Sequence, residues 1–166
     1  MKSSEYTIKY IGLKNGSHTF EYRIGKKFFD QYEYTQAVDG EFDIEVVLLK
    51  SHSMLQLDFT VNGNVNFPCD LCLENVNLPI KNTGVSLIRF GDKTNNFDEE
   101  IRVYGPEVFE VDLVPYFNEY IQLAIPSRIV HEDTDDCNQV VISKLNDIRA
   151  TEDQETDPRW DKLKDL

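Results

Sequence analysis

Cysteine, tryptophan and long apolar runs are scarce in this sequence. Its 166 residues hold three cysteines and one tryptophan. Three cysteines cannot form a disulfide framework, and a chain without about 18 consecutive apolar residues has no candidate membrane-spanning helix. Residues 1–6 also lack the apolar stretch of a signal peptide. We therefore expect a soluble, cytoplasmic protein with no membrane partner.

Positive charge is scarce as well. Lys and Arg number 17 against 30 Asp and Glu, which gives a formal net charge of −13. Residues 91–166 contain 8 basic and 19 acidic side chains, whereas residues 1–90 contain 9 and 11. An acidic surface repels a phosphate backbone at long range and attracts a basic partner. The charge predicts contact with a basic protein rather than nonspecific nucleic-acid binding, with simple solubility as the alternative.

The period of two that is typical of β-strands dominates the first two thirds of the chain. Every second residue is apolar over 42–48 and 55–61, and shorter alternating runs follow up to residue 111. Asn15-Gly16, between the runs 5–13 and 18–24, predicts a β-hairpin. Asn62-Gly63-Asn64 predicts a bulge or bend. The fold class predicted is α+β, mainly an antiparallel β-sheet, with closure into a barrel left open.

Helical spacing occurs in two places within this β-rich part. Phe28, Phe29 and Tyr32 predict a short helix that lays aromatic rings on the sheet. The stronger pattern begins at Asp112, whose carboxylate suits a helix N-terminus, and stops at Pro126. One or two helices are therefore expected to cover the sheet.

The composition changes after residue 130. Acidic stretches flank a weak helical pattern over 141–148, and such sequences bury too little apolar area to offset the entropy of ordering. We therefore divide the chain into one β-rich globular domain, residues 1–130, and a poorly ordered acidic tail, residues 131–166. Trp160, Leu163 and Leu166 are spaced for one helical face. This amphipathic ending is expected to dock on the protein's own sheet or in a partner's groove.

Cys69 and Cys72 have the Cys-x-x-Cys spacing that brings two sulfurs to one metal ion or to each other. Pro68 and the alternating segment after the pair disfavour a thioredoxin-like redox motif. A structural zinc site needs four ligands. The remaining candidates, none of which forms a second close pair, are Cys137, His18, His52 and His131. Three interpretations stay open: buried cysteines at a turn between strands, part of a metal site, or redox chemistry.

Residues suited to RNA contact are few. The concentration of basic side chains is Arg23, Lys26 and Lys27, with Arg89 a lesser candidate. Aromatic residues that could stack on bases lie close to them in sequence, namely Phe28, Tyr32 and Tyr34. A short run of lysines on a helix is more often its solvated face.

Three stretches taken in order resemble one family. Gly63 is followed by Cys69, Cys72, Leu73 and Glu74; a helix runs from Asp112 to Pro126; and the ending is Asp157, Pro158, Arg159 and Trp160 followed by spaced leucines. This order is similar to that of the large ribosomal RNA subunit accumulation proteins, the YceD-like family. The resemblance implies a role without enzymatic activity in bacterial ribosome biogenesis, with a ribosomal protein or a large-subunit assembly intermediate as partner.

The sequence departs from that family at the cysteine pair. Members commonly have an arginine inside the Cys-x-x-Cys turn and a second cysteine pair that completes a zinc site. Here the turn holds Asp70 and Leu71, and Cys137 stands alone. We therefore expect no bound cofactor, since zinc would need ligands from His131 or from a second molecule.

Two other classes of function are compatible with the sequence. A metal-binding or redox protein would use Cys69 and Cys72, although no zinc-protease motif, phosphate-binding loop or nucleophile elbow accompanies them. A β-sheet adaptor would capture an extended peptide at a sheet edge.

Overall fold

The computed structural model describes residues 4–30, 40–92, 94 and 101–152. They fall into two compact units that alternate along the chain. Unit 1 comprises Met1–Phe67 and Asn77–Ser127, and unit 2 comprises Pro68–Val76 and Arg128–Leu166. The segment 68–76 therefore belongs to the same unit as the C-terminal segment. A single boundary at residue 130 would instead place the two segments in different parts of the chain.

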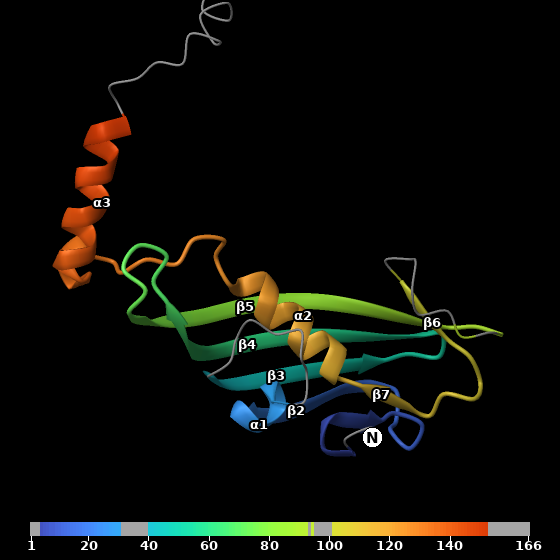
Figure 1. Cartoon of the computed structure of the whole chain (residues 1–166). Helices are drawn as coiled ribbons and strands as arrows, with labels where there is room; N and C mark the ends of the chain where they lie inside the picture. The colour runs from blue at the N-terminus through green and yellow to red at the C-terminus, as the bar shows by residue number, and fades with distance from the viewer. Residues whose placement is uncertain (1–3, 31–39, 93, 95–100, 153–166) are drawn as a thin grey trace, which may run out of the picture. The chain divides into compact units, whose positions relative to one another are not determined.

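Unit 1 is built on a five-stranded sheet in the order β2-β3-β4-β5-β6 (Figure 1). The strands are β2 (Gly16–Ile24), β3 (Gly40–Lys50), β4 (Met54–Pro68), β5 (Asn75–Phe90) and β6 (Arg102–Tyr104). The predicted α+β fold with a mainly antiparallel sheet is confirmed. β5 and β6 are parallel, so pairing is not antiparallel throughout. Within the described residues β2 and β6 are the sheet edges, and the sheet does not close into a barrel.

The central strands bury one face, as their alternation predicts. Eight inward side chains of β3 and β4 are at most 1% exposed, namely Phe42, Ile44, Val46, Leu48, Leu55, Leu57, Phe59 and Val61. The register sets Val46 opposite Phe59 and Leu48 opposite Leu57. Because each such side chain contributes about 1.5–3 kcal/mol on burial, this double row is the centre of the unit 1 core.

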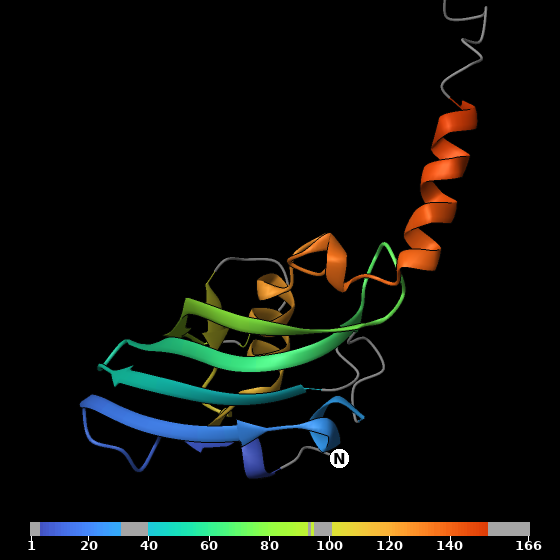
Figure 2. The same ribbon diagram turned by 90° about the vertical axis from the view of Figure 1, so that its left-hand side faces the viewer.

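α2 (Val114–Ala124) crosses the buried face of the sheet (Figures 1 and 2). The helix begins two residues after the predicted start, because Asp112 is the last residue of β7 (Glu110–Asp112). The Asp112 carboxylate still accepts the Val114 backbone N–H at 3.1 Å, and Pro115 lies in the first turn, where no N–H is needed. Phe59 of β4 contacts the rings of Tyr116 and Tyr120 at centroid distances of 5.4 and 4.9 Å. The aromatic stripe of the helix is therefore core.

The predicted hairpin at Asn15-Gly16 is wrong. β1 (Thr7–Lys9) pairs with β7 (Glu110–Asp112) in a separate two-stranded sheet, and β2 pairs with β3. The ammonium group of Lys50 donates to the carbonyl oxygens of Tyr10 and Leu13, each at 2.8 Å, while the Tyr10 hydroxyl donates to the Val108 carbonyl. These long-range bonds turn the first strand toward β7. Gly16 keeps the positive φ, +131°, but its turn joins two different sheets.

The predicted bulge at Gly63 is wrong as well, because β3 and β4 stay in continuous register through it. Glycine is needed there for close approach. A Cβ on Gly63 would lie 2.3 Å from the Glu41 carbonyl oxygen and 2.5 Å from the Phe42 ring.

Gly63→Ala is therefore expected to lower the free energy of unfolding by roughly 1–3 kcal/mol, the range for overpacking, as measured by urea denaturation. The control is Gly12→Ala, since a Cβ there meets nothing within 4 Å. Equal stabilities of the two variants would contradict this account of Gly63.

The remaining helices are short or differ in extent from the prediction. α1 (Lys26–Phe29) confirms the start of the first predicted helix, and Tyr32 lies outside the described residues. η1 (Ser4–Tyr6) and η2 (Thr134–Asp136) are single 3-10 turns. α3 (Gln139–Glu152) is longer than the pattern over 141–148 predicted. Among the described residues, every helix is too short or too polar to cross a membrane.

Candidate metal centre

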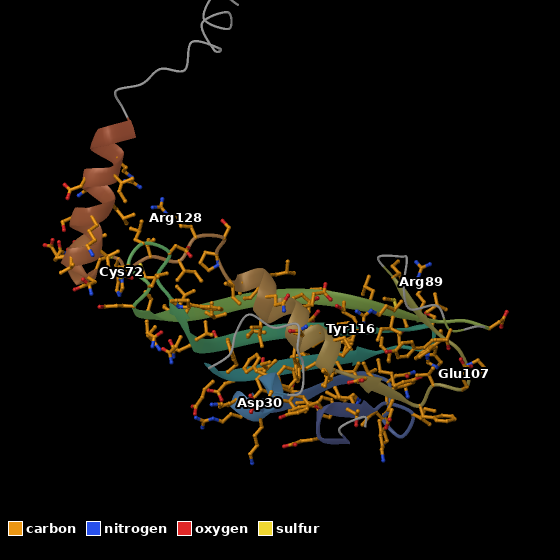
Figure 3. The ribbon with its side chains drawn as sticks, in the orientation of Figure 1. Asp30, Cys72, Arg89, Glu107, Tyr116 and Arg128 are labelled. Atoms are coloured by element: carbon orange, nitrogen blue, oxygen red, sulfur yellow. The ribbon has the colours of Figure 1, made fainter. Side chains whose placement is uncertain are left out.

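Unit 2 is formed by two segments that are distant in sequence. The first is the loop at 69–74 between β4 and β5, where Figure 3 labels Cys72. The second runs from Arg128 through η2 into the first turn of α3. Among the described residues of this unit, the buried ones are the three cysteines of the chain, with exposed fractions of 0–4%.

The Cys69–Cys72 turn is held by its own backbone. The Leu73 N–H donates to the Cys69 carbonyl at 2.9 Å, and the Cys69 N–H donates to the Glu74 carbonyl at 2.8 Å. The Leu71 N–H points at the Cys69 sulfur at 3.4 Å. Because the backbone closes around the first sulfur, both thiols face the same side of the turn before any ion is present.

This geometry forces Leu73 into the left-handed region, with φ at +64°. A residue with a side chain pays roughly 1–2 kcal/mol there, and Leu73 recovers little by burial because it is 77% exposed.

Leu73→Gly is therefore expected to stabilise the turn by about 0.5–1 kcal/mol, after subtracting the greater unfolded-state entropy of glycine. Hydrogen exchange of the Cys69 amide should slow by about 2- to 5-fold. Leu73→Ala is the matched control, since it removes the side chain but keeps the backbone penalty. Equal exchange rates in the two variants would contradict the role of φ.

Asp70 connects the two segments of unit 2. Its backbone N–H donates to the Ile129 carbonyl at 2.7 Å, and its carboxylate accepts the Ile129 N–H at 2.6 Å. The Asn138 side-chain amide donates to the Glu74 carboxylate at 2.9 Å. These contacts bring the residues that flank Ile129 to the cysteine turn. Sequence analysis assigned no role to Asp70 or Asn138.

His131 and Cys137 complete a four-donor cluster with the cysteine pair. One ligand atom from each of Cys69, Cys72, His131 and Cys137 lies within 4.8 Å of all the others. The His131 Nδ1 is 3.6 Å from the Cys72 sulfur and 3.4 Å from the Cys137 sulfur. Zn–S and Zn–N bonds of about 2.3 and 2.0 Å place the donors of a tetrahedral site about 3.4–3.8 Å apart. Both distances from His131 fall in this range, and the four donors lie close enough together to converge on a single zinc ion.

The electrostatics of the cluster favour a cation. Burial raises the pKa of the Cys69 thiol, but hydrogen bonds from the backbone N–H groups of Cys72, Leu71 and His131 lower it further, to about 6. Burial and hydrogen bonds with the other two thiols raise the pKa of Cys137 to about 11. Of Cys69 and Cys137, Cys69 is therefore the one that carries negative charge at the lower pH.

Of the two ligand sources that the sequence left for a zinc ion, His131 and a second molecule, the structure brings His131 to the three cysteines as a fourth donor. The other two histidines lie elsewhere: His18 contacts the Lys14 carbonyl, and His52 contacts the side chain of Asn15. In the sequence, the signal for this second half of the site is that His131 lies six residues before Cys137. The pair also lies at a turn between strands rather than at a helix start, as its flanking sequence predicted.

Several of the candidate RNA contacts are engaged within the protein or lie apart from the others. Arg23 pairs with Glu41 at 3.0 Å and with Asp43 at 3.9 Å. Lys26 and Lys27 are exposed on α1, but Phe28 beside them is 1% exposed and cannot stack on a base. Arg89 lies at the other end of the sheet from α1 (Figure 3). The RNA contact stays a prediction.

The other predicted residues lie in two places. Leu73 and Glu74 are exposed at the cysteine turn. The residues of the C-terminal motif and of the predicted docking face are outside the described part of the chain, namely Asp157, Pro158, Arg159, Trp160, Leu163 and Leu166. Tyr34, the remaining aromatic candidate for RNA contact, is outside it as well.

Comparison with known proteins gives one match. The family model described as "Large ribosomal RNA subunit accumulation protein YceD" matches residues 57–166. The chain belongs to the YceD family. The YceD match includes the cysteine turn, α2, His131, Cys137 and α3, and it confirms the resemblance found in the sequence. No curated protein and no solved structure matches the chain.

Proposed function

We propose that this YceD-family protein is a non-enzymatic factor in the biogenesis of the bacterial large ribosomal subunit. It supports accumulation of large-subunit ribosomal RNA in the cytoplasm through contacts with a ribosomal protein or an assembly intermediate. The observation that carries the proposal is the family match over residues 57–166. The buried cysteine cluster is consistent with a structural role, because its donor atoms face one another.

The outward face of β2 and β3 supports a basic protein as the partner. Four acidic side chains are exposed there, namely Glu21, Glu41, Asp43 and Glu45. Arg23, the basic residue among them, is already paired with Glu41 and Asp43. A surface of this sign accelerates encounter with a basic protein and opposes encounter with bare RNA.

Glu45→Gln tests this surface. Glu21 lies directly opposite Glu45 in the β2–β3 register, and like charges in that position are destabilising. The variant is expected to gain roughly 0.2–1 kcal/mol in free energy of unfolding, measured by urea denaturation, while recovering less partner in a low-salt pull-down. Glu21→Gln should relieve the same repulsion, so the double variant should gain little more. Undiminished partner recovery would exclude the face as a contact surface.

The function itself is tested by depletion. The ratio of large-subunit to small-subunit ribosomal RNA is expected to fall when the protein is depleted and to return when the full chain is expressed again. Pull-downs at low and high salt should recover large-subunit components. An unchanged ratio without such recovery would refute the proposal, and recovery of an extended peptide from an unrelated protein would favour a β-sheet adaptor.

A further inference from the structure

We propose that Cys69, Cys72, His131 and Cys137 bind one zinc ion and that this binding folds unit 2. The inference does not depend on the ribosomal role. It replaces the four-cysteine site implied by the family resemblance with a site made of three thiolates and one imidazole.

The donor set selects the class of metal. Thiolate sulfur and imidazole nitrogen in a tetrahedral arrangement suit zinc, whereas magnesium and calcium require oxygen ligands and higher coordination numbers. Three of the donors are sulfurs with exposed fractions of 0–4%. The Nδ1 atom of His131 is in contact with the sulfurs of both Cys72 and Cys137. No further side chain is needed to close the coordination sphere.

Unit 2 has almost no other core. In its described residues the fully buried side chains are the three cysteines, and only half-buried apolar side chains surround them, namely Leu71, Val76, Val130, Val141 and Ile142. A segment of this size does not bury enough apolar surface to fold by itself, and a structural metal is the usual substitute. Three uncoordinated thiols, which are weak hydrogen-bonding groups, cannot take that place.

The ion would join segments that are distant in sequence. Cys72 and His131 are 59 residues apart. Apart from the half-buried apolar side chains around the cysteines, their segments are joined by hydrogen bonds of Asp70 and Glu74, and those of the two carboxylates are exposed. Exposed hydrogen bonds of this kind compete with water. Four coordinate bonds to one zinc ion, two from the Cys69–Cys72 turn and two from His131 and Cys137, would hold the two segments together more firmly than those hydrogen bonds do.

The test uses the full chain, reduced and stripped of metal by a chelator. Titration with cobalt(II), as a spectroscopic probe, is expected to reach one ion per chain with the visible absorption of a tetrahedral thiolate site, and zinc should displace it. Hydrogen exchange should then slow by more than about 10-fold at the Ile129 and Cys137 amides on adding zinc, while the amides of β3 and β4 stay unchanged. Equal exchange at Ile129 and Cys137 with and without zinc would overturn the folding claim.

Variants of His131 identify the fourth ligand. His131→Cys should still bind cobalt(II), with a spectrum shifted to that of four thiolates. Mutating a residue that only hydrogen-bonds to a metal ligand lowers metal affinity by about 10- to 100-fold. His131→Ala removes a ligand itself and should therefore weaken zinc binding by more than that. His52→Ala, at a histidine of unit 1, is the control and should change neither quantity. A cobalt spectrum unaltered in both His131 variants would overturn the assignment, whatever the outcome of the depletion experiment.

Discussion

Phe117→Ala is expected to cost unit 1 about 3–5 kcal/mol, the range for removing a fully buried phenylalanine. Phe117 is 0% exposed on the inner face of α2. Its ring contacts four rings from other elements, those of Tyr6, Tyr22, Phe28 and Phe59, at centroid distances of 6.0, 5.4, 6.3 and 6.3 Å. A loss of this size is a large share of the 5–15 kcal/mol that stabilises a typical domain.

Urea denaturation followed by circular dichroism measures that loss. Leu123→Ala is the matched control, because Leu123 lies on the same helix and is 70% exposed; its effect should stay within about 0.5 kcal/mol. Comparable losses in the two variants would mean that α2 is not anchored through its aromatic face.

Cys137→Ser is expected to release zinc from the protein and to expose residues 128–152 to protease. Serine is a poor zinc ligand and removes one of four donors, so the affinity should fall by more than about 100-fold. Elemental analysis after gel filtration measures the zinc, and limited proteolysis measures the order of the segment. Unit 1 should keep its unfolding midpoint because its core contains none of the cysteines.

The control for this variant is Ser143→Ala, at an exposed position of α3 whose hydroxyl bonds only within the helix. It should retain zinc and resist protease. Retention of stoichiometric zinc by Cys137→Ser would show that Cys137 is not a ligand, and the proposed centre would then lack a fourth donor.

The sheet face and α2 were predictable because their signals are local. Val46 and Phe59 follow a period of two over long strands, and Asp112 with Pro115 marks a helix start in four residues. The pairing of β1 was not predictable. It depends on Lys50 reaching carbonyl groups about 40 residues earlier in the chain, and no local pattern encodes such a bond.

The cysteine cluster shows the same division. Cys69 and Cys72 were visible as a pair because their spacing is local. His131 and Cys137 carry no motif of their own, and the contacts that bring them to the pair run through Asp70 and Ile129, 59 positions apart. The sequence therefore named His131 and Cys137 among four candidates but could not select them over His18 and His52, since donors meet by tertiary contact.

The interleaving of unit 2 has a consequence during protein synthesis. After Cys72 the ribosome adds 65 residues up to and including Cys137, which takes roughly 3 to 13 s at about 5–20 residues per second. For that interval the nascent chain carries two thiols whose partners do not yet exist. The pair must pass this window without being oxidised, and its tight turn offers no protection, because the backbone N–H groups around the Cys69 sulfur lower the pKa of that thiol and favour the more readily oxidised thiolate.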